Sequence, residues 1–407
     1  MGEPQTVLLL ERYGVRGGAQ VVLCDLVYNL DRDRFRPIVA CLAPGEMVDD
    51  LRSRGIITHV VPIGKIRTLS QLASAVRQAT RLAAECRREK VRLVHINQLG
   101  GRLPIVFGEV LARMLRTPSV WHVHNPPDGL TSRKARIFFR LVSHLQPAWT
   151  IFANPLSMQT YAGFYAQTRC HSLILPGIPQ LNPEQGNGIS PRQEFGIGDD
   201  IPVVAMVARV TELKAQHELV EAIAELAHRD IHVHALICGG LGPPEYLDRL
   251  TRLAAQLGIA DRITFTGHIE GAPKSAIVDC CDIYVHTATF ESLGLAVLEA
   301  MAAGTPVIAA DAPGPSFIIR PEENGLLYRR GDPIALADNI ESLIRNPQKR
   351  DSLGRAARLR AAEFSIEAMV ESVQDVWRSL LDVGPMVDHP NCLHSGDSIR
   401  HHAHHSQ

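Results

Sequence analysis

The chain has 407 residues, of which 45% are hydrophobic and 21% charged, and its formal net charge is −1. This composition is typical of a folded globular protein and excludes a disordered or collagen-like chain. The length exceeds what one hydrophobic core usually organises, so we expect two domains. No apolar run approaches the roughly 20 residues of a membrane-spanning helix, and Glu11 and Arg12 close the run Val7–Leu10, so we expect neither a membrane span nor a signal peptide.

Short apolar runs alternate with amphipathic segments through the first half of the chain. The runs predicted to form strands are Val7–Leu10, Ile38–Leu42, His59–Ile63, Leu93–Ile96, Val120–Val123, Ile151–Ala153 and Leu173–Leu175. Between them lie segments of helical period such as Leu69–Glu89, whose apolar residues follow the i, i+3, i+4 pattern. This alternation predicts a parallel sheet covered by helices.

The proline- and glycine-rich segment Pro176–Pro202 is predicted to link two domains. A second series of predicted strands follows at Val203–Ala208, Ile231–Cys238, Ile263–Thr266, Ile283–His286, Val307–Ala310 and Leu326–Tyr328. Helices are predicted at Glu218–Ala227, Tyr246–Leu257, Leu295–Ala303, Pro333–Ile344, Pro347–Ala362 and Ile366–Leu381. The two halves are thus similar in architecture.

The cysteines and the histidines of the tail do not predict a metal site. None of the eight cysteines has Cys-x-x-Cys spacing, which favours reduced thiols in a cytosolic protein. Residues 383–407 lack apolar periodicity, so we expect a disordered tail whose histidines are incidental.

Charge is divided unequally along the chain. Residues 1–180 hold 23 Lys and Arg against 12 Asp and Glu, and the remainder holds 19 against 31. The first half therefore suits an anionic partner, or else carries solvated arginines on its helices. Two stretches hold much of this charge: Arg77, Arg81, Arg87, Arg88 and Lys90, then Arg133, Lys134, Arg136 and Arg140 with Phe138 and Phe139 interleaved. Such stretches suit an anionic membrane surface, unless the two phenylalanines belong to the core.

Ligands of open parallel sheets bind beyond the carboxyl ends of the strands, so the residues there are candidates for function. After Val7–Leu10 comes Gly17-Gly18-Ala19-Gln20, where glycine allows close backbone approach and a helix N-terminus favours phosphate. A plain tight turn has the same pattern. After Val203–Ala208 come Arg209 and Lys214, two cations that suit a diphosphate or are simply surface charges.

The most specific segment is Phe290–Gly304, which follows the predicted strand Ile283–His286. Glu291 precedes a predicted helix, and Glu299 falls about a turn into it, on an apolar stretch. A carboxylate placed there must be paired or hydrogen-bonded. Sugar and ribose hydroxyls are natural donors to such acceptors.

This segment resembles the Glu-x7-Glu motif of the large fourth family of retaining glycosyltransferases, which have the GT-B fold. The resemblance extends from about Val7 to Leu381. It includes Ala208-Arg209 with Lys214, Cys238-Gly239-Gly240, Phe265-Thr266-Gly267-His268, Gly304-Thr305-Pro306, Asn324-Gly325-Leu326, Gly17-Gly18-Ala19-Gln20 and Trp121-His122-Val123-His124-Asn125. The chain departs from the family pattern at Ala208 and Ala215, where glycine is usual, at Pro176-Gly177 in place of Asn-Gly, and at Ser316-Phe317, where a glutamate is common.

The resemblance implies an α/β fold of two Rossmann-like parallel-sheet domains that face each other across a cleft. The acceptor-side domain would span residues 1–180 and the nucleotide-sugar domain residues 181–363, with a helix over 364–382 packing back toward the first domain. The resemblance also implies roles for single residues. Arg209 and Lys214 would neutralise the donor diphosphate, Glu291 would bind the transferred sugar, and His124, or less favourably His122, would lie beside that sugar. The other donor-binding residues would be Gly17, Gly18, Gly239, His268, Leu293, Gly294, Leu295 and Glu299, with Glu299 on the ribose.

The implied reaction is transfer of a hexosyl group, with retention of configuration, from a nucleotide-diphosphate sugar. The acceptor would be lipid-linked, a saccharide or a small molecule, in cell-envelope or polysaccharide biosynthesis. The enzyme would be cytoplasmic, either in solution or at the inner face of the membrane. We expect no metal, because Arg209 and Lys214 supply positive charge, no cofactor, and no nucleic-acid partner. The alternatives are a nucleotide-sugar epimerase, a phosphorylase, or a degenerate relative that binds a sugar nucleotide without catalysis.

Overall fold

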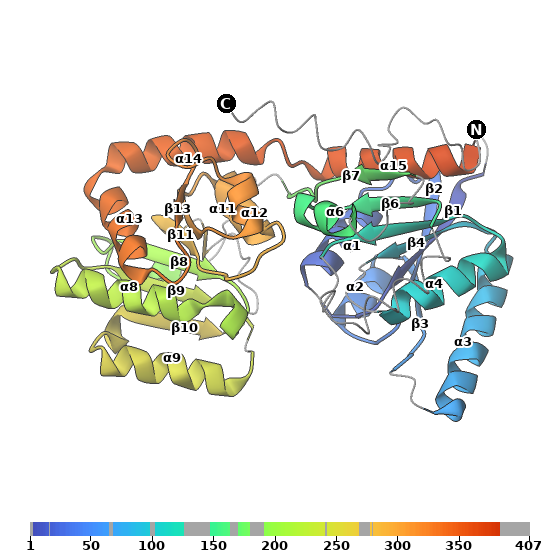
Figure 1. Ribbon diagram of the computed structural model, residues 1–407, viewed down its shortest axis with the longest axis horizontal. Coiled ribbons are helices and arrows are strands. Elements are labelled where there is room, and N and C mark those ends of the chain that lie inside the picture. Colours follow the sequence, from blue (N-terminus) through green and yellow to red (C-terminus); the bar gives the residue numbers. More distant parts are fainter. Residues whose placement is uncertain are drawn as a thin grey trace. The chain divides into compact units, whose positions relative to one another are not determined.

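The computed structural model describes residues 3–15, 17–64, 68–97, 102–125, 147–162, 170–179, 191–240, 242–267, 277–278 and 280–382. The chain divides into two compact units. Unit 1 comprises Met1–Gly177 together with Ile366–Gln407, and unit 2 comprises Ile178–Ser365. Each unit contains a parallel sheet flanked by helices (Figure 1), which confirms the predicted pair of α/β domains.

The sheet of unit 1 has seven strands in the order β3-β2-β1-β4-β5-β6-β7, all paired in parallel. The strands are β1 Gln5–Glu11, β2 Phe35–Cys41, β3 Ile57–Val60, β4 Val91–Asn97, β5 Ser119–Val123, β6 Trp149–Phe152 and β7 His171–Leu173. The helices are α1 Gly18–Tyr28, α2 Glu46–Ser53, α3 Leu69–Arg88, α4 Arg102–Leu115, α6 Pro155–Ala162 and α15 Ile366–Asp382.

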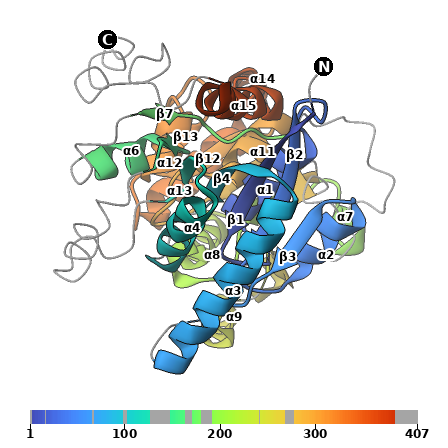
Figure 2. The same cartoon turned by 90° about the vertical axis from the view of Figure 1, so that its right-hand side faces the viewer.

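The two faces of this sheet are covered by different helices. Alternate strand residues such as Leu8, Val94 and Trp121 form one core with α3 and α4. Because successive strand residues point to opposite faces, Leu9 and His95 face the other side, where α1 and α15 pack against each other and α15 contacts β4. Figure 2 shows α15 near the strands β1 and β2 of this unit.

The sheet of unit 2 has six strands in the order β10-β9-β8-β11-β12-β13, also parallel. The strands are β8 Val203–Val207, β9 His234–Cys238, β10 Ile263–Gly267, β11 Ile283–His286, β12 Val307–Ala310 and β13 Leu326–Tyr328. The helices are α7 Pro191–Glu194, α8 Gln216–His228, α9 Pro244–Gln256, α11 Leu295–Ala303, α12 Pro313–Ile318, α13 Pro333–Arg345 and α14 Pro347–Ala361, with short 3-10 turns η2 Glu212–Lys214 and η3 Ala260–Arg262.

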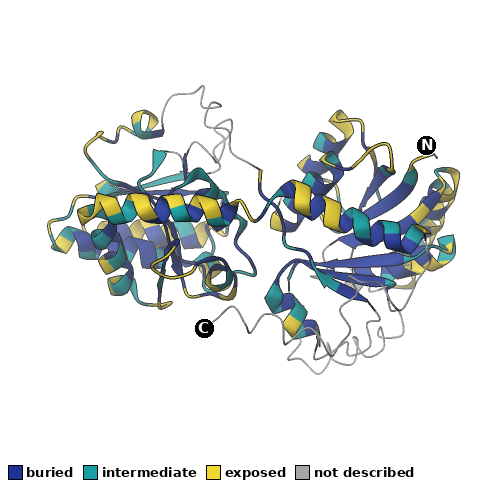
Figure 3. Ribbon diagram, turned by 90° about the horizontal axis from the view of Figure 1, so that it is seen from above, coloured by how far each residue is buried: buried dark blue, intermediate teal, exposed yellow. Residues whose placement is uncertain are grey.

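This second sheet is also buried on both faces. Alternate residues such as Val204, Ile237 and Val285 form a core with α8, α9 and α13. Their neighbours Ala205 and Tyr284 are equally buried on the opposite face. Figure 3 shows buried strands beneath helices whose outer sides are exposed, as expected for parallel sheets.

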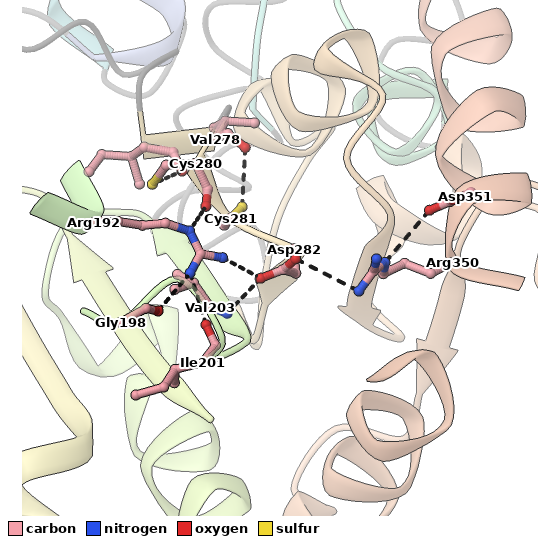
Figure 4. A network of polar contacts seen from close by, with 11 residues as sticks. Arg192, Gly198, Ile201, Val203, Val278, Cys280, Cys281, Asp282, Arg350 and Asp351 are labelled. Carbon is pink, nitrogen blue, oxygen red and sulfur yellow. Dashed lines mark hydrogen bonds and ion pairs between the residues drawn. The ribbon is translucent and has the colours of Figure 1, made fainter. Parts of the chain in front are cut away.

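A polar network secures the start of unit 2, at the amino ends of its central strands (Figure 4). Arg192 of α7 donates to Cys280 O at 3.0 Å and to Ile201 O at 2.9 Å, and it pairs with Asp282 Oδ2 at 2.6 Å. The same Asp282 oxygen accepts from Val203 N at 2.8 Å. The network therefore joins the residues that begin β8 and β11, at the sheet edge opposite the candidate site.

Every predicted strand overlaps a strand of the structure, and ten of the thirteen differ from it by one to three residues at one or both ends. The third strand is Ile57–Val60 rather than His59–Ile63, although Val61 N and Ile63 N still donate to backbone oxygens of Cys41 and Leu42 at 2.8 and 3.2 Å. The strand predicted at Ile231–Cys238 begins at His234, because His234 is the first residue that pairs with β8, opposite Val203. The last strand of unit 1 is His171–Leu173, paired with Thr150–Phe152, because β6 ends at Phe152.

Candidate active site

Arg209 and Lys214 follow β8 at the carboxyl edge of the unit 2 sheet. The Arg209 side chain is exposed, and within the described part of the chain its guanidinium forms no hydrogen bond or ion pair. Its backbone oxygen accepts from Gln216 Nε2 at 2.9 Å, which ties the loop to the start of α8. An exposed guanidinium on a fixed backbone is free to bind an anion.

Lys214 is held against the loop that follows β11. Thr287 Oγ1 donates to Lys214 O at 2.6 Å, and Thr289 N donates to Leu213 O at 3.0 Å. The Lys214 ammonium then lies 2.5 Å from Glu291 Oε2. Lys214 and Glu291, which are 77 positions apart in the sequence, therefore form a direct ion pair.

Glu291 is the centre of a three-residue cluster. His286, the last residue of β11 and only 1% exposed, places Nε2 3.3 Å from the same Glu291 oxygen that contacts Lys214. Burial would raise the pKa of Glu291, but the His286 hydrogen bond and the Lys214 charge outweigh burial and lower that pKa to about 2. Glu291 is therefore an ionised acceptor at neutral pH.

The N-terminus of α11 lies beside this cluster. Gly294 caps the helix with φ at 102°, a left-handed conformation that favours glycine, and Leu295 begins the helix. Gly314 N donates to Glu291 O at 2.9 Å, and a Cβ on Gly314 would lie 2.4 Å from Leu293 O. The turn Leu293–Leu295 is thus packed against α12, with the first amides of α11 available at a helix end that favours phosphate.

Glu299 lies further along α11 and is half-buried. Burial raises the pKa of the Tyr284 phenol, and the Glu299 charge raises it further. The Glu291 charge raises the same pKa, so both glutamates of the motif lie near this one tyrosine of β11.

Gly239 allows two loops to approach each other. Its φ is 150°, and a Cβ there would lie 2.0 Å from Ala208 O. The structure therefore gives Gly239 a backbone role, holding the Ala208–Arg209 loop near the end of β9. His268, also predicted to bind the donor, lies outside the described residues, as do residues 133–140 and the histidine-rich tail.

In unit 1 the diglycine lies at the start of α1. Gly17 is the N-cap, with extended backbone at φ −152°, and Gly18 is the first helical residue. Two residues later Gln20 Nε2 donates to Glu11 Oε1 at 2.9 Å, joining the helix to the end of β1. The predicted phosphate-favouring helix start is therefore present, without a left-handed glycine at Gly17.

His124 follows β5 and is 6% exposed. Its Nε2 lies 2.8 Å from Asn97 Oδ1, and its backbone oxygen accepts from Asn154 Nδ2 at 2.7 Å. Burial lowers the pKa of His124 to about 3, so the ring is neutral at pH 7. His122 is 1% exposed and packs against His124, with ring centroids 4.2 Å apart and the rings tilted by 33°. Its Nδ1 is 3.3 Å from His95 Nε2.

The sequence reasoning did not select Glu11, Asn97, His95 or His286, which contact the predicted residues. Glu11, Asn97 and His286 end their strands after apolar runs. Because ligands bind at the carboxyl ends of parallel strands, the position of these three residues at strand ends is a sequence signal for function. His95 lies inside a buried strand and carries no such signal. Among the described residues there is no cluster of three or more His, Cys, Asp or Glu suited to a metal ion, and no helix long and apolar enough to cross a membrane.

Two family models match the chain, one in each unit. A model described as "Glycosyl transferases group 1" matches residues 190–360, and one described as "Glycosyl transferase 4-like domain" matches residues 17–162. D-inositol 3-phosphate glycosyltransferases of Nocardia farcinica and Salinispora tropica are 33% identical over 216 residues and 36% identical over 181 residues. These matches cover 51% and 43% of this chain and 47% and 38% of the relatives, so the match spans half or less of their length.

Solved structures share the fold over nearly the whole chain. HepE from Anabaena, solved in complex with UDP and glucose, has a TM-score of 0.77 at 24% identity, covering 92% of this chain and 100% of that one. A glycosyltransferase from Rickettsia africae has a TM-score of 0.79 at 18% identity, covering 94% and 100%. Because both units match glycosyltransferase models and the fold is shared with GT-B glycosyltransferases, the chain belongs to the group 1, or fourth-family, glycosyltransferases of GT-B fold.

Proposed function

We propose that the protein transfers a hexosyl group from a nucleoside diphosphate sugar, with retention of configuration and without a metal ion. The observation that carries this proposal is the cluster at one edge of the unit 2 sheet: exposed Arg209, Lys214 paired with Glu291, and the N-terminus of α11. Two cations and a helix N-terminus are suited to a diphosphate leaving group, and an ionised carboxylate is suited to sugar hydroxyls.

The ion pair supports retention without a covalent glycosyl-enzyme. Glu291 shares one oxygen with both Lys214 and His286, and its pKa of about 2 makes it a weak nucleophile but a good hydrogen-bond acceptor. Catalysis would then rest on stabilising charge on the departing diphosphate, whose oxygen takes the proton of the acceptor hydroxyl on the same face of the sugar.

The relatives suggest which substrates to test first. HepE was solved with UDP and glucose, so UDP-sugars lead the donor trials. The curated relatives are named for D-inositol 3-phosphate, an anionic acceptor, and the 23 Lys and Arg of residues 1–180 suit an anion. A phosphorylated or lipid-linked saccharide acceptor is consistent with the same charge, and would place the enzyme in cell-envelope or polysaccharide biosynthesis.

The direct test measures binding and turnover together. UDP, GDP and ADP are titrated calorimetrically, then the sugar form of the tightest one is incubated with acceptors in excess chelator. We expect turnover with chelator, and Arg209→Ala to lower kcat by about 100-fold or more through lost leaving-group stabilisation. Exposed Arg252 of α9 is the matched control, and Arg252→Ala should be neutral. Activity that is lost in chelator and restored by Mg²⁺ would refute the metal-free mechanism.

The same assay separates the alternatives. An epimerase would give product with no acceptor, and a phosphorylase would require pyridoxal phosphate, which has its own absorbance. A degenerate relative would bind nucleotide without turnover. The contacts of Lys214 and His286 with Glu291 favour a catalytic site over one that only binds nucleotide.

We also propose that unit 1 contacts an anionic membrane surface through the first half of α3. Leu69 is 84% exposed and Val76 57%, with Leu72 exposed between them at helical spacing. Arg77 and Arg81 follow on the same exposed segment. Figures 1 and 2 show α3 extending beyond the strands of its unit. An apolar stripe flanked by arginines is typical of interfacial helices.

Vesicle co-sedimentation tests this contact. Binding to anionic vesicles should weaken as salt rises, and Leu69→Ser with Arg77→Glu should weaken it further. Lys349→Glu in unit 2 is a charge-matched control. Equal sedimentation with neutral and anionic vesicles, or none with either, would favour an enzyme with an anionic small-molecule acceptor.

A further inference from the structure

A chain of buried polar side chains crosses the carboxyl edge of the unit 1 sheet. Glu11 ends β1, Asn97 ends β4 and His124 follows β5, and these strands are neighbours in the sheet. Their exposures are 0%, 1% and 6%. Asn97 Nδ2 donates to Glu11 Oε2 at 2.6 Å, and Asn97 Oδ1 lies 2.8 Å from His124 Nε2. Buried donors and acceptors that are hydrogen-bonded in this way fix one another's orientation.

The orientation of the Asn97 amide follows from its other contacts. Its nitrogen faces two acceptors, Glu11 Oε2 at 2.6 Å and Ala19 O at 3.2 Å. Ala19 O can only accept. Glu11 accepts at Oε1 from two donors, Arg12 N at 2.7 Å and Gln20 Nε2 at 2.9 Å, although burial raises the pKa of its carboxyl. Turning the amide over would set Asn97 Oδ1 against both of these oxygens and leave it without a donor. Asn97 therefore presents its oxygen, and not its nitrogen, to His124.

An acceptor opposite Nε2 determines which ring nitrogen of His124 carries the proton. Asn97 Oδ1 cannot donate, so Nε2 must be the N–H and Nδ1 the lone pair. We propose that Glu11 and Asn97 are positioning residues that hold His124 as the neutral Nε2–H tautomer, with Nδ1 left to accept a hydrogen bond from substrate. The substrate contact rests on the function proposed above, whereas the tautomer does not.

A second chain of contacts sets the tautomer of the adjoining ring, His122, and burial keeps that ring neutral. The indole Nε1 of Trp377 in α15, which can only donate, lies 3.2 Å from His95 Nδ1. His95 must then carry its proton on Nε2, which donates to His122 Nδ1. His122, whose ring packs against that of His124, is therefore also an Nε2–H ring. Burial lowers the pKa values of all three histidines, so no imidazolium forms beside His124 at neutral pH.

The first test uses the unaltered full-length protein. With ¹⁵N-labelled histidine, long-range proton–nitrogen spectra distinguish a protonated from an unprotonated ring nitrogen, and His124→Gln assigns the signal. We expect His124 Nδ1 to have the shift of an unprotonated nitrogen in the free protein. A protonated Nδ1 would overturn the proposal, whatever the enzymatic activity proves to be.

Glu11→Gln tests the positioning role. The glutamine oxygen should stay where Arg12 N and Gln20 donate, so its amide nitrogen would face Asn97 Nδ2, donor against donor. We expect the Asn97 amide to turn over and His124 to change to the Nδ1–H tautomer. The matched control is Gln20→Met, which removes another hydrogen bond to the same carboxylate but leaves Asn97 in place. An unchanged tautomer in folded Glu11→Gln would show that Glu11 does not position the ring.

The kinetic signature separates this role from general damage and from a wrong proposed function. Glu11→Gln should lower kcat by about 10- to 100-fold, by analogy with loss of the partners that orient metal-bound histidines, with UDP affinity unchanged. Gln20→Met should retain most of kcat. Equal losses in both variants would indicate a merely structural role. Wild-type protein that binds none of UDP, GDP and ADP would refute the proposed function and leave the tautomer result standing.

Discussion

Ala215 adopts a backbone conformation that alanine disfavours. It follows Lys214 with φ at 49° and ψ at 40°, and its side chain is fully buried. A left-handed residue other than glycine costs roughly 1–2 kcal/mol. The glycine usual in the related family would relieve this cost, so the departure at Ala215 affects stability near the diphosphate site more than it alters the contacts of Lys214.

The strain at Ala215 predicts opposite effects for two glycine substitutions. Ala215→Gly should raise the free energy of unfolding by up to about 1 kcal/mol, since relief of strain exceeds the added entropy of the unfolded chain. Ala208→Gly, at a position with negative φ, should lower it by about 0.5–1 kcal/mol. Urea unfolding measures both. Destabilisation by Ala215→Gly equal to that by Ala208→Gly would refute the strain argument.

The shifted pKa values predict that the charges of Glu291 and His124 do not change over the working pH range. A lowered carboxyl pKa keeps Glu291 ionised above about pH 3, and a lowered imidazole pKa keeps His124 neutral above about pH 4. The Cε1 proton shift of His124 should therefore stay constant between about pH 5 and 8. A titration midpoint of His124 between about pH 5 and 8 would contradict the burial argument.

At the scale of elements, the sequence predicts the positions of the strands better than the contacts between side chains that follow different strands. Apolar periodicity located each strand, because a strand buried on both faces must be apolar throughout. Periodicity does not show that Lys214 would meet Glu291, since that contact depends on threonines of the β11 loop that hold η2. For the same reason, His95 could not be selected: its importance arises from the pairing between β4 and β5, which brings it to His122.

Close packing of α12 against the motif turn leads to a prediction about donor affinity. A Cβ at Gly314 would lie 2.4 Å from Leu293 O, so Gly314→Ala must displace the turn at the N-terminus of α11. Overpacking of this kind costs about 1–3 kcal/mol. We expect UDP affinity to fall by about 10-fold or more in calorimetry. Gly64→Ala, whose Cβ would meet nothing within 4 Å, is the control. Unchanged UDP affinity in Gly314→Ala would show that this turn does not take part in donor binding.

At the scale of the whole molecule, the chain enters unit 2 at Ile178 and leaves it at Ser365, and these two residues pair in parallel. Unit 2 is therefore one continuous segment, whereas unit 1 is completed by α15 from the far end of the chain. The apolar side chains of α15 that are buried are Ile366, Met369, Val370, Val373, Val376, Trp377 and Leu380. At about 1.5–3 kcal/mol for each buried side chain, their sum is on the order of the whole stability of a domain.

The two units should therefore differ when expressed as fragments. Residues 178–365 should fold alone, unfold cooperatively and bind UDP with the affinity of the full chain, if the donor site lies within unit 2 as proposed. Residues 1–177 alone should lack a cooperative thermal transition, because β4 and α1 lose the helix that covers them. Adding a peptide of residues 366–382 should restore the transition, and the same peptide with Trp377→Ala should restore it less, since Trp377 is fully buried against Phe35 and His95. A fragment 1–177 that melts cooperatively at the same temperature with and without the peptide would show that α15 covers the sheet without stabilising it.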